Sequence, residues 1–236
     1  MKVAVMFSGG KDSVFAVDHC LSKGWDIQYL LSVKPSRRDC YLFHYATVEH
    51  TPHLADALNC KQILVGCDVA DPVEEAKIVR AIVAKNPVDA VVLGGVGLQE
   101  TQLRSVRDAL FDLGVEVFAA HKDEDEEVLM RRMIADGYRV ILTEIASDGL
   151  SEEWLGKELT LENFEKLKVL SQKFGFDLLG EGGYYNSLVI DGPIFTKRLE
   201  LVESKKVMEA ANSGYLLVEK VAVVPKTQSI YNQKVR

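Results

Sequence analysis

The stretch Met6-Phe7-Ser8-Gly9-Gly10-Lys11-Asp12-Ser13 decides how the rest of this chain is interpreted. It follows an apolar run, Val3 to Phe7, that predicts a buried strand. It precedes residues whose apolar spacing turns helical from Val14 onward. We therefore expect a strand–loop–helix corner, named here the Met6–Ser13 corner. Its two glycines carry no Cβ atom, so the backbone can approach a ligand closely.

The chemistry of this corner predicts a polyphosphate site. Ser8 and Ser13 offer hydroxyl donors, and the unpaired amides in the first turn of the helix favour an anion. Lys11 adds a positive charge, and Asp12 adds a carboxylate that could hold Mg²⁺ beside the phosphates. The expected nucleotide-binding residues here are Ser8, Gly9, Gly10, Lys11, Asp12 and Ser13.

Two common phosphate-binding motifs do not fit the corner. The P-loop needs Gly-x-x-x-x-Gly-Lys-Ser/Thr, whereas here the lysine follows a glycine pair and an aspartate comes next. The dinucleotide fingerprint needs a third glycine, which is missing at the required spacing. A glycine-rich turn that merely starts a helix is the alternative interpretation.

Composition restricts the class of protein. The 236 residues are long enough for one large domain or two modest ones, and 47% are hydrophobic. A net charge of −7 argues against a broad nucleic-acid-binding surface. No apolar run is long enough to span a bilayer, and the N-terminus lacks the pattern of a signal peptide. We therefore expect no membrane partner and a cytoplasmic location.

Cysteine usage agrees with a reducing compartment. The four cysteines show no Cys-x-x-Cys spacing, which disfavours a zinc ribbon or an iron–sulfur cluster. They are expected to be free thiols: Cys20, Cys40, Cys60 and Cys67.

Strands alternate with helices over the first half of the chain, which predicts an α/β fold with a doubly wound parallel sheet. The expected strands are 3–7, 26–33, 62–65, 89–93 and 115–119; the expected helices include 11–23, 51–58 and 71–85. In such sheets ligands bind at the carboxyl ends of the strands. The loop that begins at Gly94-Gly95 should therefore face the same edge as the Met6–Ser13 corner.

The pattern changes near residue 120. A charge run, 121–127, is interpreted as solvated surface at the start of a helix. A helix is expected over 161–174, and alternating segments around 198–202 and 215–221 predict an antiparallel hairpin. We therefore expect two domains: residues 1–120, which carry the polyphosphate site, and residues 121–236, which form a smaller α/β domain.

The pattern Ser-Gly-Gly-x-Asp-Ser resembles the PP-loop of N-type ATP pyrophosphatases. Further motifs extend the likeness to the diphthine–ammonia ligase family over about residues 1–220. They are Tyr41-x-Phe43-His44, Gly94 with Gln102-x-Arg104, Gly149-Leu150 with Glu153-Trp154-Leu155-Gly156, Gly180-Glu181-Gly182-Gly183, and Asp191-Gly192-Pro193.

This resemblance implies an ATP-dependent ligase that releases AMP and pyrophosphate. Members adenylate the carboxylate of diphthine on elongation factor 2, the acceptor, and ammonia then forms the amide. The resemblance thus implies that residues 1–120 bind ATP and residues 121–236 bind the acceptor. The implied partners are ATP, Mg²⁺, ammonium and the elongation factor, with a homodimer as an option. The implied catalytic residues are Lys11, Asp12 and Glu181. Further nucleotide-binding candidates are His44, Gly94, Gly95, Gln102 and Arg104.

Several roles stay open at this point. His44 could orient nucleotide or acceptor, and Arg104 could contact phosphate or form a structural ion pair. Typical members carry an acid where this chain has Tyr184, and an apolar segment where it has His121-Lys122-Asp123. The alternatives are a PP-loop ATPase that modifies another acceptor, tRNA or a small molecule, and a non-catalytic adenine-nucleotide-binding protein.

Overall fold

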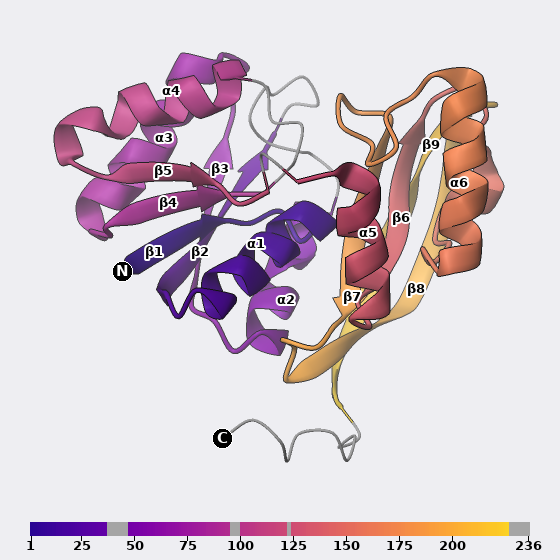
Figure 1. The fold of residues 1–236 in the computed structure, drawn as a ribbon, viewed down its shortest axis with the longest axis horizontal. Coiled ribbons are helices and arrows are strands. Elements are labelled where there is room, and N and C mark those ends of the chain that lie inside the picture. The colour runs from indigo at the N-terminus through magenta and orange to yellow at the C-terminus, as the bar shows by residue number, and fades with distance from the viewer. Residues whose placement is uncertain (37–46, 95–99, 122–123, 227–236) are drawn as a thin grey trace.

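A computed structural model describes residues 1–36, 47–94, 100–121 and 124–226, with the side chains of 100–102 left out. Its first sheet has five parallel strands in the order β3-β2-β1-β4-β5. This arrangement confirms the predicted doubly wound α/β fold (Figure 1). The strands are β1 (Lys2–Met6), β2 (Asp26–Pro35), β3 (Gln62–Cys67), β4 (Ala90–Leu93) and β5 (Glu116–Ala119).

Helices cover both faces of this sheet. Apolar side chains of α1 and α2 pack with Val3, Val5 and Leu30 on one face. Those of α3 and α4 pack with Ala4 and Leu31 on the other. Neighbouring residues of one strand thus serve opposite layers, as the alternation of a strand requires. The helices are α1 (Lys11–Ser22), α2 (Thr51–Ala57), α3 (Pro72–Lys85) and α4 (Glu100–Leu110).

The helix starts differ in their caps. Asp71 caps α3 as expected, since its carboxylate accepts hydrogen bonds from the backbone N–H groups of Val73 and Glu74. Thr51 is the first residue of α2 rather than its cap, which is His50. The hydroxyl of Thr51 donates instead to the carbonyl of Val48, 2.6 Å away, and so supports the short 3₁₀ turn η1 (Val48–His50).

The second sheet is antiparallel, in the order β7-β6-β9-β8. The predicted hairpin is confirmed, and its strands are longer than the alternating segments suggested. Two helices accompany the sheet, linked by ion pairs from Arg131 to Glu165 and from Lys168 to Glu127. The elements are β6 (Arg139–Ala146), β7 (Tyr185–Asp191), β8 (Lys197–Ala210), β9 (Ser213–Pro225), α5 (Glu126–Ala135) and α6 (Leu161–Phe174).

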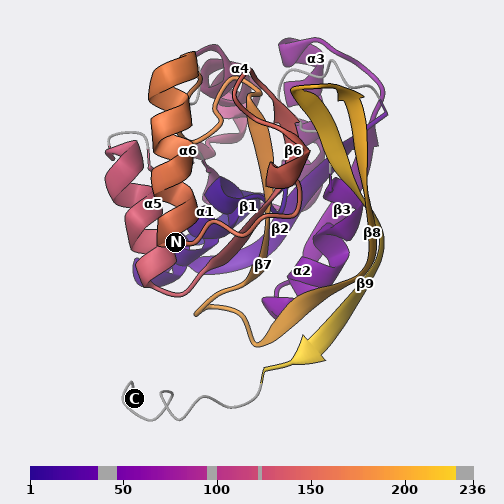
Figure 2. The same cartoon turned by 90° about the vertical axis from the view of Figure 1, so that its right-hand side faces the viewer.

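The two sheets share one hydrophobic core. Phe7, Val14 and Leu54 from the first half belong to the same buried cluster as Met130 and Leu188 from the second half. Figure 1 shows β7 and α5 close to α1, and Figure 2 shows the long β8–β9 hairpin curving past α2. The halves are therefore packed into one body, which fixes loops from both near a common site.

The charge run is only partly solvated. His121 is 2% exposed, stacks on Phe15 with ring centroids 4.9 Å apart, and places Nδ1 2.8 Å from Glu124. Arg132 also lies over Phe15, with its guanidinium carbon 4.8 Å from the ring centroid. The interpretation as solvated surface is therefore wrong for His121, because α1 covers the imidazole. Lys122 and Asp123 lie outside the described residues.

Two smaller expectations concern the thiols and the membrane. Cys20, Cys60 and Cys67 are free thiols, and burial raises the pKa of Cys20 to about 12. Such a thiol is inert at neutral pH. Across the stretches of chain that the structure describes, every helix is too short or too polar to cross a bilayer.

Candidate nucleotide site

The Met6–Ser13 corner is folded by the hydroxyl of Ser13. Its Oγ accepts from the backbone N–H groups of Gly9, at 3.1 Å, and Ser8, at 3.3 Å. It donates to the carbonyl of Gly10, at 2.9 Å. Ser8 Oγ also lies 3.3 Å from Ser13 Oγ. The two hydroxyls predicted as ligand donors therefore also hold the loop in shape.

Lys11 and Asp12 form an ion pair at the start of α1. The lysine is 4% exposed, and its Nζ lies 2.7 Å from Asp12 Oδ2. The same Nζ is 5.7 Å from the centroid of the Tyr185 ring, within the range of a cation–π contact. A buried ammonium needs such partners because leaving water is costly for a charge. The pair is therefore held in place before any ligand binds.

Strand β7 lies directly against the corner. The backbone N–H of Val189 donates to the carbonyl of Gly9 at 3.0 Å, and that of Lys11 donates to Ser187 Oγ at 3.2 Å. A Cβ on Gly10 would lie 3.2 Å from the carbonyl oxygen of Ser187. Gly9 has φ +82°, and a Cβ there would lie 2.5 Å from a methyl group of Leu54. The glycine pair thus fits the corner between α2 and β7.

Gly94 directly follows β4 and lies beside the first turn of α1. A Cβ at this position would lie 2.4 Å from the backbone carbon and oxygen of Asp12 and 2.7 Å from the nitrogen of Ser13. The resemblance made this glycine a nucleotide-binding candidate. In the structure the backbone of Asp12 fills the space beside it, so the missing Cβ lets the end of β4 approach the first turn of α1.

Replacing Gly94 with alanine should therefore displace the first turn of α1. We expect a loss of about 1–3 kcal/mol in the free energy of unfolding, typical of overpacking a rigid contact. Nucleotide affinity should fall with it, because Asp12 moves. Chemical denaturation and calorimetric titration with ATP measure both quantities. Gly66→Ala is the matched control for stability, since a Cβ there meets nothing within 4 Å. An equal loss of unfolding free energy in the two variants would contradict the packing argument.

A glycine-rich loop from the second half carries Glu181. Gly180, Gly182 and Gly183 all have positive φ, which glycine adopts without steric cost. Asp177 holds the loop, because its Oδ1 accepts from the backbone N–H groups of Leu179 and Glu181 at 2.9 and 2.8 Å. Tyr185 follows the loop, is buried, and donates its hydroxyl to the carbonyl of Leu178 at 2.7 Å.

The electrostatics of this loop are coupled to those of the corner. Burial, together with the charge of Asp12, raises the pKa of Glu181 to about 7, against an opposing effect of Lys11. Asp177 and Glu126 contribute in the same direction. Burial also raises the pKa of Glu126, as do the charge of Asp177 and a hydrogen bond with it. The charges of Asp12, Asp177 and Glu126 thus all act on Glu181, and an acid with a pKa near 7 can take up or release a proton at neutral pH.

Sequence reasoning missed three members of this constellation. Glu126 was assigned to the solvated charge run, and Asp177 and Ser187 carry no motif of their own. The spacing of Asp177, four residues before Glu181 at the start of a glycine-rich loop, was the one available signal. Within the described ranges, no three His, Cys, Asp or Glu side chains are arranged to hold a metal ion by themselves.

Of the remaining candidates, the structure describes the side chain of Arg104 but not those of Gln102 and His44. Arg104 has a side chain 75% exposed on α4, with its Nε 3.8 Å from Asp108. Such a surface pair contributes little to stability. Gln102 lies in α4, with its side chain outside the described part. His44 and Gly95 also lie outside the described residues. The structure therefore brings together Ser8 to Ser13, Gly94 and Glu181.

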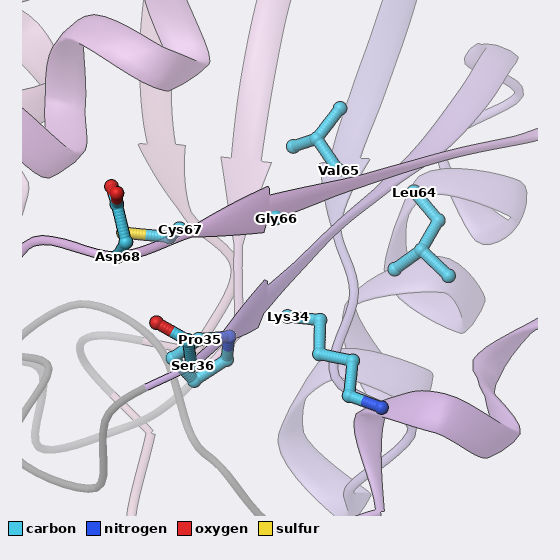
Figure 3. Close-up of a pocket in the computed structure, with 8 residues that line it drawn as sticks. All are labelled: Lys34, Pro35, Ser36, Leu64, Val65, Gly66, Cys67 and Asp68. Carbon is cyan, nitrogen blue, oxygen red and sulfur yellow. The ribbon is translucent and has the colours of Figure 1, made fainter.

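An open groove lies at the same edge of the parallel sheet. Its volume is about 590 Å³, and it is formed at the carboxyl ends of β2 and β3. In Figure 3 the charged groups of Lys34 and Asp68, two of the lining residues, point away from each other. The lining residues run over 34–36 and 64–68. Because β2 neighbours β1, the groove offers room beside the Met6–Ser13 corner.

Comparisons with known proteins cover nearly the whole chain. Family models described as the N-terminal and C-terminal domains of diphthamide synthase match residues 1–115 and 125–224. The chain is 27% identical to the diphthine–ammonia ligase of Mus musculus over 98% of this chain and 95% of that protein. It is 28% identical to the diphthine–ammonia ligase of Homo sapiens over 95% of this chain and 96% of that protein. It is 29% identical to that of Schizosaccharomyces pombe over 97% of this chain, but it spans 40% of that protein.

Proposed function

The chain belongs to the diphthamide synthase family, and from this premise we propose that it is an ATP-dependent diphthine–ammonia ligase. The reaction converts a carboxylate of diphthine on elongation factor 2 into an amide, and ATP is cleaved to AMP and pyrophosphate. One observation supports this assignment most directly. The phosphate-binding corner and the Glu181 loop, which come from different halves of the chain, interact electrostatically.

The first chemical step needs charge neutralisation. An oxygen of the acceptor carboxylate attacks the α-phosphorus of ATP, and the bond to pyrophosphate breaks. Negative charge grows on the leaving pyrophosphate, and Lys11 is placed to balance it. Mg²⁺ fits the site, because it takes oxygen ligands and is usually bound by one or two carboxylates together with phosphates. Asp12, at the same helix start, would supply such a carboxylate.

The second step needs a base. Ammonia attacks the carbonyl carbon of the acyl-adenylate, AMP leaves with the electron pair of the broken C–O bond, and the nitrogen must lose a proton. Glu181, with its pKa raised to about 7, can accept that proton at neutral pH. The surrounding carboxylates Asp177 and Glu126 also favour the approach of the ammonium cation. Elongation factor 2 acts in the cytoplasm, so this proposal includes a cytoplasmic location.

A defined reconstitution tests the proposal. The protein is mixed with ATP, Mg²⁺, ammonium and elongation factor 2 that carries diphthine, and products are followed by mass spectrometry and nucleotide chromatography. We expect AMP, pyrophosphate and amide in equal amounts. Formation of ADP, or AMP release with no amide on the factor, would reject the assignment.

A changed acceptor is the second candidate, and Tyr184 is the observation that favours it. Its ring is half-buried 6.2 Å from that of Phe176, where typical members carry an acid. An acceptor site with one acid fewer could fit tRNA or a small carboxylate. ATP-dependent pyrophosphate release with such an acceptor, and none with diphthine, would support it. A nucleotide-binding protein without catalysis would release no pyrophosphate with any acceptor.

A further inference from the structure

The free edge of strand β7 is completed by the nucleotide corner. β7 is the last strand of its sheet, so only one of its sides pairs with another strand. Its other side meets the loop, through Val189 N–H to the carbonyl of Gly9 and Lys11 N–H to Ser187 Oγ. An edge strand offers unpaired backbone groups, and here the loop takes one of them, the Val189 N–H, and also contacts the Ser187 side chain. The loop and the strand should therefore move together.

Ser187 supplies a helix cap from the opposite half of the molecule. The residue at the cap position of α1 is Gly10, which has no side chain to accept a hydrogen bond. The Lys11 N–H is one of the amides that a helix leaves unpaired at its start, and Ser187 Oγ accepts from it at 3.2 Å. Amides at this position also bind phosphate oxygens. The serine hydroxyl and a phosphate would thus compete for one amide.

Strand β7 directly follows the Glu181 loop, and the residues that join them are buried or hydrogen-bonded. Glu181 precedes Ser187 by six positions. Between them lies Tyr185, which is buried and anchored through its hydroxyl to Leu178. Ser187 itself is 8% exposed, between the loop and the core. A displacement at Ser187 is therefore transmitted along packed backbone to the Glu181 loop.

We propose that Ser187 is a positioning residue that couples nucleotide binding at the Met6–Ser13 corner to the geometry of the Glu181 loop. This inference rests on the proposed function. A phosphate that takes the Lys11 amide releases the serine hydroxyl, and the start of β7 adjusts to the occupied corner. The Glu181 loop then reaches the geometry that binds the acceptor only when nucleotide is present, so nucleotide binds before the acceptor.

Hydrogen–deuterium exchange of the whole protein tests the coupling without turnover. The probe is the α,β-methylene analogue of ATP with Mg²⁺, which cannot release pyrophosphate. In the unmodified protein we expect the analogue to slow exchange at residues 8–13 and at residues 180–186. In Ser187→Ala the first segment should keep its protection and the second should lose most of it. Ser187→Thr, which retains a hydroxyl, should restore the second effect.

A kinetic measurement separates coupling from a simple structural role. Loss of one hydrogen bond of this kind corresponds to a change of about three- to tenfold. For Ser187→Ala we expect a rise of that size in the KM for the protein acceptor. The dissociation constant of the analogue should fall, by at most the same factor, because the hydroxyl no longer competes for the Lys11 amide. Thr143→Val is the matched control, because it removes another buried hydroxyl from the same sheet. This control should leave exchange and KM unchanged.

The outcomes are distinct. Protection confined to residues 8–13 in the unmodified protein would overturn the coupling and leave the proposed function standing. Full protection of both segments in Ser187→Ala would overturn it as well. Protection of neither segment by the analogue would remove the nucleotide site, and with it both the proposed function and this inference.

Discussion

Asp12→Asn is expected to slow AMP formation by about two to three orders of magnitude, the loss seen when one preorganised charge-stabilising group is removed. The amide oxygen of asparagine can still accept from Lys11 Nζ, which lies 2.7 Å from the Asp12 carboxylate. It no longer supplies the negative charge that Mg²⁺ needs. The melting temperature should therefore stay close to that of the unmodified protein while turnover is lost.

The metal role has its own readout. If Asp12 holds Mg²⁺, the variant should need a higher Mg²⁺ concentration for half-maximal AMP formation. Asp12→Ala should lose turnover equally and should also be less stable, because the ammonium of Lys11 is then buried without its partner. Turnover within a factor of about two of the unmodified enzyme in either variant would contradict the assignment.

Glu181→Gln is expected to keep ATP binding and to lose amide formation by about two to four orders of magnitude, the usual contribution of a positioned acid or base. Glutamine has nearly the same shape and cannot take the proton from the attacking nitrogen. The acyl-adenylate should then accumulate and be detectable after rapid acid quenching. Glu200→Gln, on the exposed part of β8 beside Arg198, is the control that should change nothing.

The pH dependence follows from the raised pKa of Glu181. A base must be deprotonated, so the rate of amide formation should fall as the pH drops below about 7. The inflection near pH 7 should vanish in Glu181→Gln. Stability responds in the opposite direction. The folded pKa exceeds the ordinary value of 4.5, so ionisation between pH 4.5 and about 7 favours the unfolded state.

Glu181→Gln should therefore raise the melting temperature at pH 8 and leave it nearly unchanged at pH 4. Paired activity and melting profiles over this range test both signs. An inflection near pH 7 that persists in the variant would assign the titration to another group. Equal changes in melting temperature at both pH values would show that the pKa of Glu181 is not raised in the folded protein.

The fold class and the nucleotide corner followed from local patterns. Apolar runs of four to eight residues, separated by segments with helical spacing, identified the strands that form the parallel sheet. The glycine pair with its lysine and aspartate identified the corner, and Asp71 before a proline identified the start of α3. These features depend on neighbours along the chain, so the sequence displays them directly. The series of motifs indicated the family for the same reason, since each motif is a short run of neighbouring residues.

Tertiary structure decided which distant groups meet. Ser187 lies 176 positions from Lys11, and no periodicity records that its hydroxyl caps α1. The burial of His121 under α1, and the closeness of Glu126 to Glu181, likewise come from the tertiary packing of distant parts of the chain. Periodicity predicts that a residue faces the core, but it does not predict which residue it contacts there. The Met6–Ser13 corner can therefore be predicted from the sequence, whereas its contact with β7 and its closeness to the Glu181 loop depend on the tertiary structure.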